Sequence, residues 1–450
     1  MNFGFVTKDN MSLLTDLYEL TMAQVYFKKG MNKNAIFDFY IRPAKNRSYF
    51  INAGLEQLVY YLLNIKFTKD DIQYLRSTGL FEEDFLSYLK NFRFTGNLYA
   101  VEEGEVIFPN EPVVQVEAPI IEAQIIETFV INTLQHPILV ATKAMRAYSV
   151  ARGTVLVDFG LRRAHGTDAG MKAARASYIG GFAGTSNVLA GKEYGIPVFG
   201  TMAHSFILAH RDEVEAFKDF TSVYPENSVL LVDTYDTIQG VYNAVKAIRE
   251  LGLKHFKGIR IDSGDILTLS KKAREILDRE GFKDAIIIVS GGINEYKIKQ
   301  LLDAGAPVDG WGVGTELVVS ADLPYLDCAY KLVEYDGRPV MKFSTKKKTL
   351  PYKKQIYRIE KDGILEKDII TVYNEEVKGG IPLLKQVIKN GELVTELPSL
   401  GQIRQKAINS FQKLPDELKS IEKTIQFLPE VSPEIVRTME ELERQYRGGR

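Results

Sequence analysis

Cysteine and tryptophan are nearly missing from this sequence, with one of each among 450 residues. The single cysteine, Cys328, excludes a disulfide within the chain and is typical of a reducing compartment. Long apolar runs are missing too, since none approaches the ~20 residues that a membrane-spanning helix requires. The first ten residues also lack the apolar core of a secretory signal. We therefore expect a cytoplasmic protein that does not bind a membrane.

An excess of charge of either sign is also absent. The chain has 57 Lys and Arg residues against 58 Asp and Glu residues, which gives a formal net charge of −1. This balance provides no overall positive field, so we expect no nucleic-acid partner. Hydrophobic residues make up 45% of the chain, which is ordinary for a globular protein. The length of the chain favours two domains.

The stretch from about 150 to 315 alternates short apolar runs with longer segments of helical periodicity. The apolar runs predict strands at 155–160, 198–202, 230–235, 258–262, 286–291 and 311–314. The segments between them predict helices that include 207–220, 237–251, 267–279 and 295–304. Successive βα units pair their strands in parallel, and six or seven units favour a barrel over an open sheet. We expect this α/β domain to span residues 126–325.

The two ends of the chain differ in character from the middle. Residues 1–125 combine a predicted helix at 13–27 with strand-like segments and Gly/Pro turns. Residues after 325 contain hairpin signals at three Asp-Gly or Asn-Gly pairs, followed by a charged helical tail. We expect the N-terminal α+β domain, 1–125, and the C-terminal segment, 326–450, to pack together beside the α/β domain.

Polar groups follow two predicted strands in arrangements that suit a ligand site. Residues 158–163 (DFGLRR) place an aromatic ring ahead of two guanidinium groups, which suits a flat, anionic, aromatic ligand. Residues 200–205 (GTMAHS) place a histidine beside a hydroxyl group. Parallel α/β folds carry their functional residues at the carboxyl ends of the strands, so both runs predict chemistry.

Together with SLLTDLYELTM at 12–22, these runs resemble the nicotinate phosphoribosyltransferase family, over about residues 10–360. The resemblance implies an irregular, incomplete TIM-like α/β barrel with a flanking α+β domain. It implies that nicotinate and phosphoribosyl pyrophosphate (PRPP) are converted to nicotinate mononucleotide and pyrophosphate in NAD salvage, with ATP hydrolysis coupled to the reaction. It also implies a homodimer with the active site at the subunit interface.

Glycines at two further strand ends favour a phosphate site. Residues 290–292 (SGG) precede one predicted helix, and residues 312–315 (GVGT) precede a second helical segment. Glycine lets backbone N–H groups approach an anion, and a helix N-terminus adds a favourable dipole. The alternative is that the glycines only turn the chain. The resemblance assigns the 5′-phosphate of the ribosyl group to these loops, with the binding residues Gly291, Gly292, Gly312, Gly314 and Thr315.

Hydroxyl groups and charged side chains at the middle strand ends suit a pyrophosphorylated sugar. Asp262 and Ser263 are candidates to hold the ribose hydroxyls, and Arg260 is a candidate to counter negative charge. A carboxylate beside the ribose also stabilises the positive charge that develops when the C1–O bond breaks.

Three aspartates are candidates for a Mg²⁺ site, because hard cations take oxygen ligands. They are Asp233, Asp236 and Asp265. A cation there would stabilise the departing pyrophosphate. Asp236 is equally suited to cap the helix that follows it.

Among the five histidines, His204 is the one predicted to be functional, because it follows a predicted strand end. The resemblance implies that ATP phosphorylates this histidine and that turnover of the phosphohistidine drives nucleotide synthesis. A neutral imidazole nitrogen attacks a phosphate best when a neighbouring group orients the ring, and Asp233 is a candidate for that role.

Phe159, at a strand end beside Arg162, is the predicted stacking face for nicotinate, and Arg162 would pair with the carboxylate; the alternative for Phe159 is ordinary strand core. The resemblance implies that Tyr18 completes the stack across a dimer interface, with a place in the core as its alternative. In a lysine-rich segment at 342–354, Lys347 matches a lysine that approaches the phosphates from the neighbouring subunit. The alternative for that segment is a solvated hairpin loop.

One segment bears on the choice between an acid and an amide substrate. The nicotinamide-specific relatives offer a carboxylate to the amide group, whereas Ser186 in the run 184–187 (GTSN) can donate to a carboxylate. An aspartate facing nicotinate would place two like charges together at a cost of several kcal/mol. This difference favours nicotinate, with nicotinamide or quinolinate phosphoribosyltransferase as the alternatives. A silent nucleotide sensor would have lost residues such as Asp262 or His204, and neither is missing.

Overall fold

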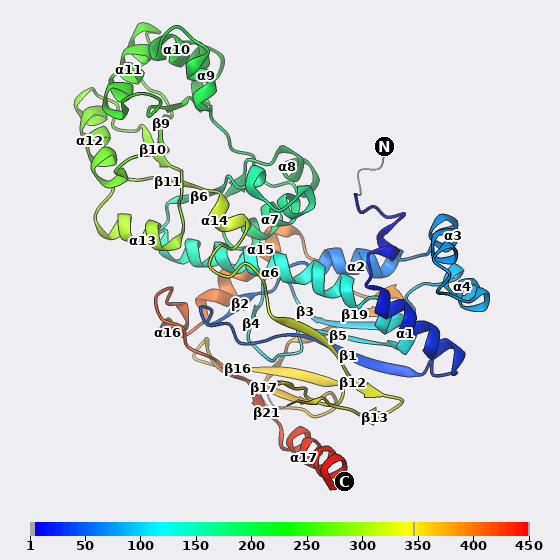
Figure 1. Ribbon diagram of the computed structural model, residues 1–450. Helices are drawn as coiled ribbons and strands as arrows, with labels where there is room; N and C mark the ends of the chain where they lie inside the picture. Colours follow the sequence, from blue (N-terminus) through cyan, green and yellow to red (C-terminus); the bar gives the residue numbers. More distant parts are fainter. Residues whose placement is uncertain (1–4, 345–346, 449–450) are drawn as a thin grey trace. The chain divides into compact units, whose positions relative to one another are not determined.

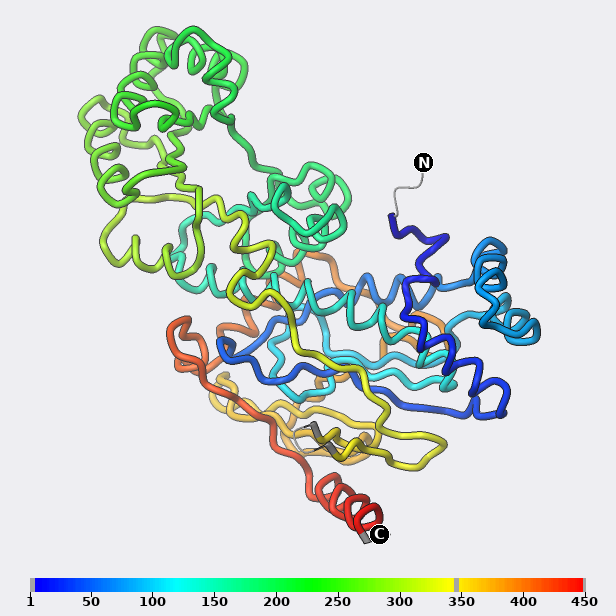
Figure 2. Tube along the Cα trace, viewed as in Figure 1, coloured from blue at the N-terminus to red at the C-terminus, as the bar shows by residue number. Residues whose placement is uncertain are grey.

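The computed structural model describes residues 5–344 and 347–448 of the chain (Figure 1, Figure 2). The chain divides into two compact units. Unit 1 consists of Met1–Leu139 and Tyr325–Arg450, so both ends of the chain contribute to it, and unit 2 is Val140–Pro324. The change from one unit to the other falls inside the long helix α6 (Glu127–Val150), later than the boundary at 126 expected from the sequence.

Unit 2 is built on a six-stranded parallel sheet with the strand order β7-β6-β11-β10-β9-β8. The strands are β6 (Val155–Asp158), β7 (Gly184–Thr185), β8 (Val229–Leu231), β9 (Gly258–Ile261), β10 (Ile286–Val289) and β11 (Gly310–Val313). They are short and mostly aliphatic, as is usual for parallel strands that are covered on both faces. The predicted α/β fold is confirmed, and the sheet is open, with β7 and β8 at its edges.

Beyond α6, the helices of unit 2 connect its strands or follow them, and several begin shortly after a polar strand end. They are α7 (Thr167–Ile179), α8 (Val188–Tyr194), α9 (His204–Leu208), α10 (Glu213–Val223), α11 (Thr237–Glu250), α12 (Ile266–Arg279), α13 (Glu295–Asp303) and α14 (Thr315–Val318). Asp236, Asp265 and Asn294 each accept a hydrogen bond from a backbone N–H in the first turn of the following helix. Such N-caps satisfy N–H groups that have no partner within the helix.

Two predicted elements of unit 2 differ in the structure. The strand predicted at 198–202 is reduced to a single parallel bridge between Thr185 and Val198. Val198 is 51% exposed, so it is not buried as a residue of a core strand would be. The single helix predicted at 207–220 is two helices, α9 and α10, because Asp212 adopts an extended conformation and caps the second one.

Unit 1 is built mainly on an antiparallel sheet with the strand order β13-β12-β1-β5-β3-β19-β20. Its strands are β1 (Asn34–Ile41), β3 (Asn97–Val101), β5 (Val114–Pro119), β12 (Cys328–Tyr335), β13 (Arg338–Pro339), β19 (Leu384–Lys389) and β20 (Glu392–Leu393). The smaller sheets contain β2 (Phe50–Ile51), β4 (Val106–Ile107), β14 (Phe343–Ser344), β15 (Lys347–Lys348), β16 (Lys354–Lys361), β17 (Ile364–Val372), β18 (Ile381–Pro382) and β21 (Glu430–Val431).

The three hairpin turns predicted after residue 325 are confirmed. They join β12 to β13, β16 to β17 and β19 to β20. Both residues of each turn have positive φ angles, from 50° to 79°: Asp336-Gly337, Asp362-Gly363 and Asn390-Gly391. Tight two-residue hairpins require this backbone conformation, which Asp, Asn and Gly adopt more readily than other residues.

The helices of unit 1 lie near the two ends of the chain. They are α1 (Leu17–Lys28), α2 (Leu55–Asn64), α3 (Lys69–Ser77), α4 (Glu83–Lys90), α5 (Ile120–Ile125), α15 (Leu400–Gln412), α16 (Asp416–Lys419) and α17 (Pro433–Gly448). Helix α1 begins four residues later than the predicted start at 13, because Asp16 is extended and separates α1 from a short 3₁₀ turn at Met11–Leu13.

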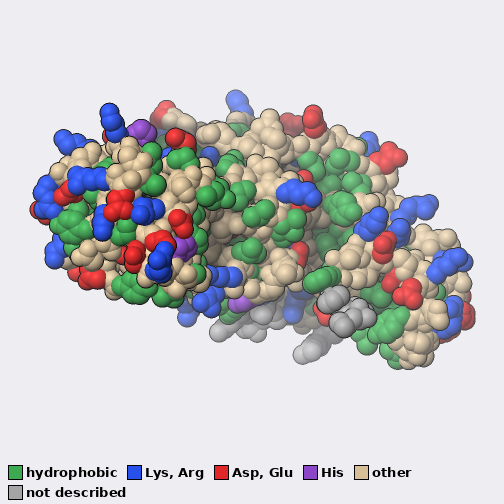
Figure 3. Space-filling view, turned by 90° about the horizontal axis from the view of Figure 1, so that it is seen from above, with side chains coloured by type: hydrophobic (Ala, Val, Ile, Leu, Met, Phe, Trp, Pro, Cys, Tyr) green, Lys and Arg blue, Asp and Glu red, His purple; other side chains and the backbone are tan. Residues whose placement is uncertain are grey.

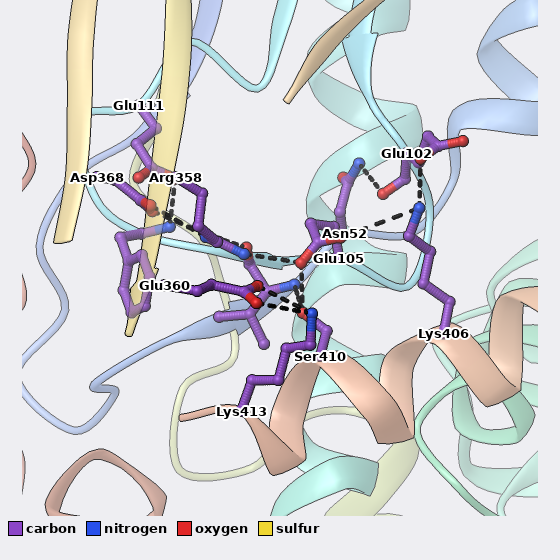
Figure 4. A network of polar contacts seen from close by, with 12 residues as sticks. Asn52, Glu102, Glu105, Glu111, Arg358, Glu360, Asp368, Lys406, Ser410 and Lys413 are labelled. Atoms are coloured by element: carbon purple, nitrogen blue, oxygen red, sulfur yellow. Dashed lines mark hydrogen bonds and ion pairs between the residues drawn. The ribbon is translucent and has the colours of Figure 1, made fainter. Parts of the chain in front are cut away.

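A buried ion cluster connects the two chain ends within unit 1 (Figure 4). Arg358 donates to both oxygens of Asp368, at 3.0 and 2.7 Å, and to Oε1 of Glu105 at 2.7 Å. Ser410 of α15 contacts the same Glu105 carboxylate. Removing one partner of such a cluster leaves a buried charge uncompensated, which costs about 3–5 kcal/mol.

The surface carries charges of both signs. On the face drawn in Figure 3, Lys and Arg side chains lie among Asp and Glu side chains, without a large patch of one sign. Among the helices of residues 5–344 and 347–448, none is both long enough and apolar enough to cross a membrane.

Candidate active site

A cavity of about 630 Å³ lies at the carboxyl ends of the parallel strands of unit 2. The predicted site residues that line it are Phe159, Arg162, Ser186, Arg260, Asp262, Gly291, Gly292, Gly312, Gly314 and Thr315. They come from the ends of four adjacent strands, β6, β9, β10 and β11, and from the residue after β7. The cavity therefore brings together the aromatic, the sugar-binding and the glycine motifs.

The aromatic end of the cavity is organised by Asp158, the last residue of β6. Its buried carboxylate accepts hydrogen bonds from Thr185 Oγ1 at 2.7 Å and from Gly160 N at 2.8 Å. Burial raises the pKa of Asp158, and the two hydrogen bonds oppose this effect. The carboxylate ties the ends of β6 and β7 together and turns the chain directly after Phe159.

The ring of Phe159 lies against the backbone of Gly312. A Cβ atom on Gly312 would lie 2.3 Å from Cδ2 of this ring, which is closer than van der Waals contact allows. Glycine is therefore required at 312 to make room for the ring, a packing role in addition to the predicted phosphate role. Arg162 and Arg163 follow on a short 3₁₀ turn, Leu161–Arg163, and both are exposed at the cavity.

Ser186 is held beside this aromatic end by its backbone. Its N–H donates to the carbonyl of Asp158 at 2.8 Å. The next residue, Asn187, is buried and caps α8, so the position of Ser186 is fixed from both sides. The half-buried Ser186 side chain lines the cavity and leaves its hydroxyl available to a ligand.

The loop after β10 depends on two glycines with left-handed backbone conformations. Gly291 has a φ of +80° and Gly292 a φ of +62°. A Cβ atom on Gly291 would lie 2.0 Å from the carbonyl oxygen of Asp262, so only glycine fits there. Asn294 then caps α13 and donates to Glu316, on the other glycine loop, at 3.5 Å.

The sugar-binding candidates form one hydrogen-bonded group. Asp233 Oδ2 accepts from the backbone N–H of Asp262 at 3.0 Å and from Ser263 Oγ at 2.6 Å. The hydroxyl of Ser290 donates to Asp262 Oδ1. Asp233 thus holds the backbone of Asp262 and the side chain of Ser263, whereas Asp262 itself lines the cavity. Asp233 Oδ1 is buried and has no hydrogen-bond partner among the described residues.

Arg260 places a guanidinium group on the cavity wall. Its Nη1 donates to Thr201 Oγ1, and its Nε is buried without a partner among the described residues. Burial lowers the pKa of this guanidinium, while Asp262 and Asp233 act in the opposite direction. A buried nitrogen without a partner has unmet capacity to donate, which suits an anionic ligand.

His204 is the first residue of α9 and adjoins the cavity-lining run Gly200–Ala203. Its Nδ1 lies 3.1 Å from Oγ1 of Thr234. Asp233, which was predicted to orient the ring, instead accepts hydrogen bonds from Asp262 and Ser263. That part of the prediction is wrong, because the strand-end turn directs the neighbouring hydroxyl to the histidine.

The remaining metal candidates cap helices. Asp265 accepts hydrogen bonds from the backbone N–H and the hydroxyl of Thr268, and these bonds lower its pKa. Asp236 caps α11, in agreement with the alternative weighed from the sequence. Within residues 5–344 and 347–448, no three or more His, Cys, Asp or Glu side chains are grouped in a way that could hold a metal ion.

Two predicted residues belong to unit 1. Tyr18 lies on α1, is 46% exposed, and has its pKa raised by partial burial and by the nearby Glu127 carboxylate. The backbone of Lys347 begins β15, but its side chain lies outside the described residues.

Three polar residues were given no role from the sequence: Thr201, Thr234 and Glu316. Thr234 follows Asp233, Glu316 follows Thr315, and Thr201 lies in the run 200–205, so proximity along the chain was the available signal. Their partners, Arg260, His204 and Asn294, come from other strand ends, and a single sequence does not pair strand ends with one another.

Comparisons with known proteins find one family along most of the chain. Family models match at residues 13–135 (nicotinate phosphoribosyltransferase N-terminal domain), 154–375 (nicotinate phosphoribosyltransferase family) and 379–438 (nicotinate phosphoribosyltransferase C-terminal domain). The chain is 47% identical to nicotinate phosphoribosyltransferase pncB2 of Mycobacterium tuberculosis, over 92% of this chain and 89% of that protein. It is 41% identical to the nicotinate phosphoribosyltransferase of Bacillus subtilis, over 96% and 95% of the two chains.

A solved structure gives the same result for the fold. The crystal structure of human nicotinic acid phosphoribosyltransferase matches with a TM-score of 0.83 and 26% sequence identity. The match covers 95% of this chain and 99% of the human chain. By sequence and by fold, the chain belongs to the nicotinate phosphoribosyltransferase family of enzymes.

Proposed function

We propose that this protein transfers the phosphoribosyl group of PRPP to nicotinate, in NAD salvage in the cytoplasm. The observation that carries the proposal is the composition of the unit 2 cavity. An aromatic ring and guanidinium groups at one end suit an aromatic carboxylate, and two glycine loops suit a phosphate. A chain with a single cysteine also suits the reducing cytoplasm.

The proposed reaction exchanges one bond at the anomeric carbon. The pyridine nitrogen of nicotinate forms a bond to C1 of the ribose, and the C1–O bond to pyrophosphate breaks with its electron pair. Phe159 would hold the pyridine ring flat, and Arg162 would pair with its carboxylate. Asp262 would bind the ribose hydroxyls and stabilise the positive charge that develops on the sugar. The products are nicotinate mononucleotide and pyrophosphate.

Mg²⁺ is the cofactor that we propose. Asp233 fits it, because the buried Oδ1 has no partner while Oδ2 is already occupied. Mg²⁺ is commonly held by one or two carboxylates together with water and substrate phosphates. Asp265 fits less well, since Thr268 already contacts its carboxylate twice. When bound, the ion would neutralise charge on the leaving pyrophosphate.

ATP is the proposed co-substrate, and His204 is the proposed phosphoryl acceptor. The contact between Nδ1 and the Thr234 hydroxyl leaves Nε2 as the nitrogen available to attack. Nε2 would form a bond to the γ-phosphorus of ATP as the bond to ADP breaks, giving a phosphohistidine. Water would later cleave that N–P bond and release inorganic phosphate during each turnover.

A homodimer is the proposed assembly. Tyr18 belongs to unit 1, whereas the cavity belongs to unit 2, and the face of α1 around Tyr18 is apolar and exposed. Leu17 and Val25 on this helix are each 55% exposed. Burying these side chains against a second copy would stabilise a dimer and would allow Tyr18 to stack on the nicotinate of the partner subunit.

Substrate choice tests the proposal most simply. We expect the protein to form product from PRPP and nicotinate but not from PRPP and nicotinamide, as measured by liquid chromatography of the reaction. The Ser186→Asp variant should raise KM for nicotinate by at least tenfold, because it would face the substrate carboxylate with a second negative charge. Ser186→Thr keeps the hydroxyl and is the matched control. Turnover of nicotinamide or of quinolinate by the unsubstituted protein would contradict the assignment to nicotinate.

A further inference from the structure

Four charged side chains of unit 2, three of them buried, form a group that joins α6 to the segments after the two glycine loops. Lys143 Nζ is 2.8 Å from Glu295 Oε2 and 2.8 Å from Asp322 Oδ1. Arg146 Nε donates to Glu295 Oε1 at 3.1 Å. The group contains two cations and two carboxylates, and its formal charges cancel. The side chains of Lys143, Arg146 and Glu295 are at most 4% exposed.

These charges connect one helix to the segments that follow both glycine loops. Lys143 and Arg146 lie on α6, in the part of that helix that belongs to unit 2. Glu295 is the first residue of α13 and follows Gly292 by three positions. Asp322 lies in the segment directly after α14, the short helix that begins at Thr315. Lys143 therefore contacts the elements that follow both loops.

The glycine loops depend on the contacts of the residues that flank them. Glycine has more conformational freedom than any other residue, so a loop of glycines is ordered mainly by what flanks it. Arg146 adds to these contacts on the α13 side, since its Nη2 donates to Tyr296 Oη at 2.8 Å. Binding groups that are held in place before the ligand arrives bind it more tightly and catalyse more efficiently.

We propose that Glu295, held by Lys143 and Arg146, is a positioning residue for the 5′-phosphate of PRPP. It would not touch the substrate. It would fix the start of α13 and thereby the spacing between the Gly291-Gly292 loop and the Gly312–Thr315 loop. This inference rests on the proposed function, because it assumes that the loops bind the phosphate of PRPP.

The test compares Glu295→Gln with a matched control in the full-length protein. Gln keeps the shape and the acceptor for Arg146 but removes the charge that Lys143 requires. We expect Kd and KM for PRPP to rise about tenfold or more, with KM for nicotinate unchanged within twofold. The control is Asp368→Asn, which also removes a buried carboxylate from an ion pair, but in unit 1. It should lower Tm while leaving both KM values unchanged.

A second variant tests the same inference where Glu295→Gln fails to fold. Tyr296→Phe removes only the hydroxyl that Arg146 contacts, on a residue that is 40% exposed, and we expect a smaller rise in KM for PRPP. Unchanged PRPP binding in whichever variants fold, beside normal binding by the unsubstituted protein, would overturn the positioning role. Absence of PRPP binding by the unsubstituted protein in calorimetry would instead contradict the proposed function itself.

Discussion

At the scale of single residues, the orientation of His204 decides which nitrogen is available for chemistry. The hydroxyl of Thr234 lies 3.1 Å from Nδ1, so Nε2 is the nitrogen left for the proposed phosphoryl transfer. Thr234→Val should lower the ATP-stimulated rate by about tenfold, because the ring loses the group that orients it. Thr234→Ser keeps the hydroxyl and should behave as the unsubstituted protein. The measurement is the steady-state rate of nucleotide formation with and without ATP.

The His204→Ala variant shows how much of the ATP-stimulated rate depends on the histidine itself. It should abolish stimulation by ATP and leave a slow ATP-independent reaction, since the cavity that binds the other substrates is intact. ATP stimulation that persists in His204→Ala would show that the phosphoryl group is accepted elsewhere.

A buried carboxylate on α1 gives a second prediction at this scale. Burial raises the pKa of Glu19 to about 7, although Thr15 and Thr128 donate hydrogen bonds to its carboxylate. Glu19 therefore binds its proton more tightly in the folded protein than in the unfolded chain. Its contribution to the free energy of unfolding is complete below pH 4.5 and is lost as the pH rises through 7. The loss should be on the order of 3 kcal/mol.

Denaturant unfolding of the parent and of Glu19→Gln between pH 5 and pH 8 checks this prediction. The variant lacks the titrating group, so the stability difference between the two proteins should shift in favour of the variant as the pH rises. A difference that stays constant across this range would contradict the assigned pKa.

At the scale of elements, the packing of β6 against β11 sets the position of the proposed nicotinate site. A methyl group on Gly312 would overlap the ring of Phe159, so Gly312→Ala should displace that ring and raise KM for nicotinate at least tenfold. Gly401→Ala is the matched control, because nothing lies within 4 Å of the added methyl group in α15. Equal kinetic constants for the two variants would argue against stacking on Phe159.

The elements also show how far the sequence alone determines the structure. Strands β9 and β10 and helices α11 and α12 lie within a few residues of their predicted ranges, because aliphatic runs and Asp N-caps are local signals. The strand predicted near Val198 is reduced to a single bridge, since an apolar run forms a strand only where a neighbour pairs with it. The location of the glycine loops and of Asp262 at strand ends was predictable for the same local reason. The contact of Thr234 with His204 was not, because it joins different strand ends.

At the scale of the whole molecule, one of the two units is built from two separate stretches of the sequence. In unit 1, Ala35 pairs with Tyr335 across the β1–β12 ladder, which no local pattern predicts. The same unit contains Tyr18 and the lysine-rich segment, whereas the cavity belongs to unit 2. In the proposed catalysis, binding and bond exchange take place in unit 2, and a second copy of the chain would supply Tyr18. Tyr18→Ala should weaken nicotinate binding without affecting PRPP binding, as measured by calorimetry; an unchanged nicotinate affinity would exclude that role.

The most direct measurement is product formation by the purified protein from PRPP, Mg²⁺ and nicotinate, with and without ATP. We predict nicotinate mononucleotide and pyrophosphate in equal amounts, formed faster when ATP is present, with inorganic phosphate released alongside. No nicotinate mononucleotide under either condition would contradict the proposed phosphoribosyl transfer, whatever the protein binds.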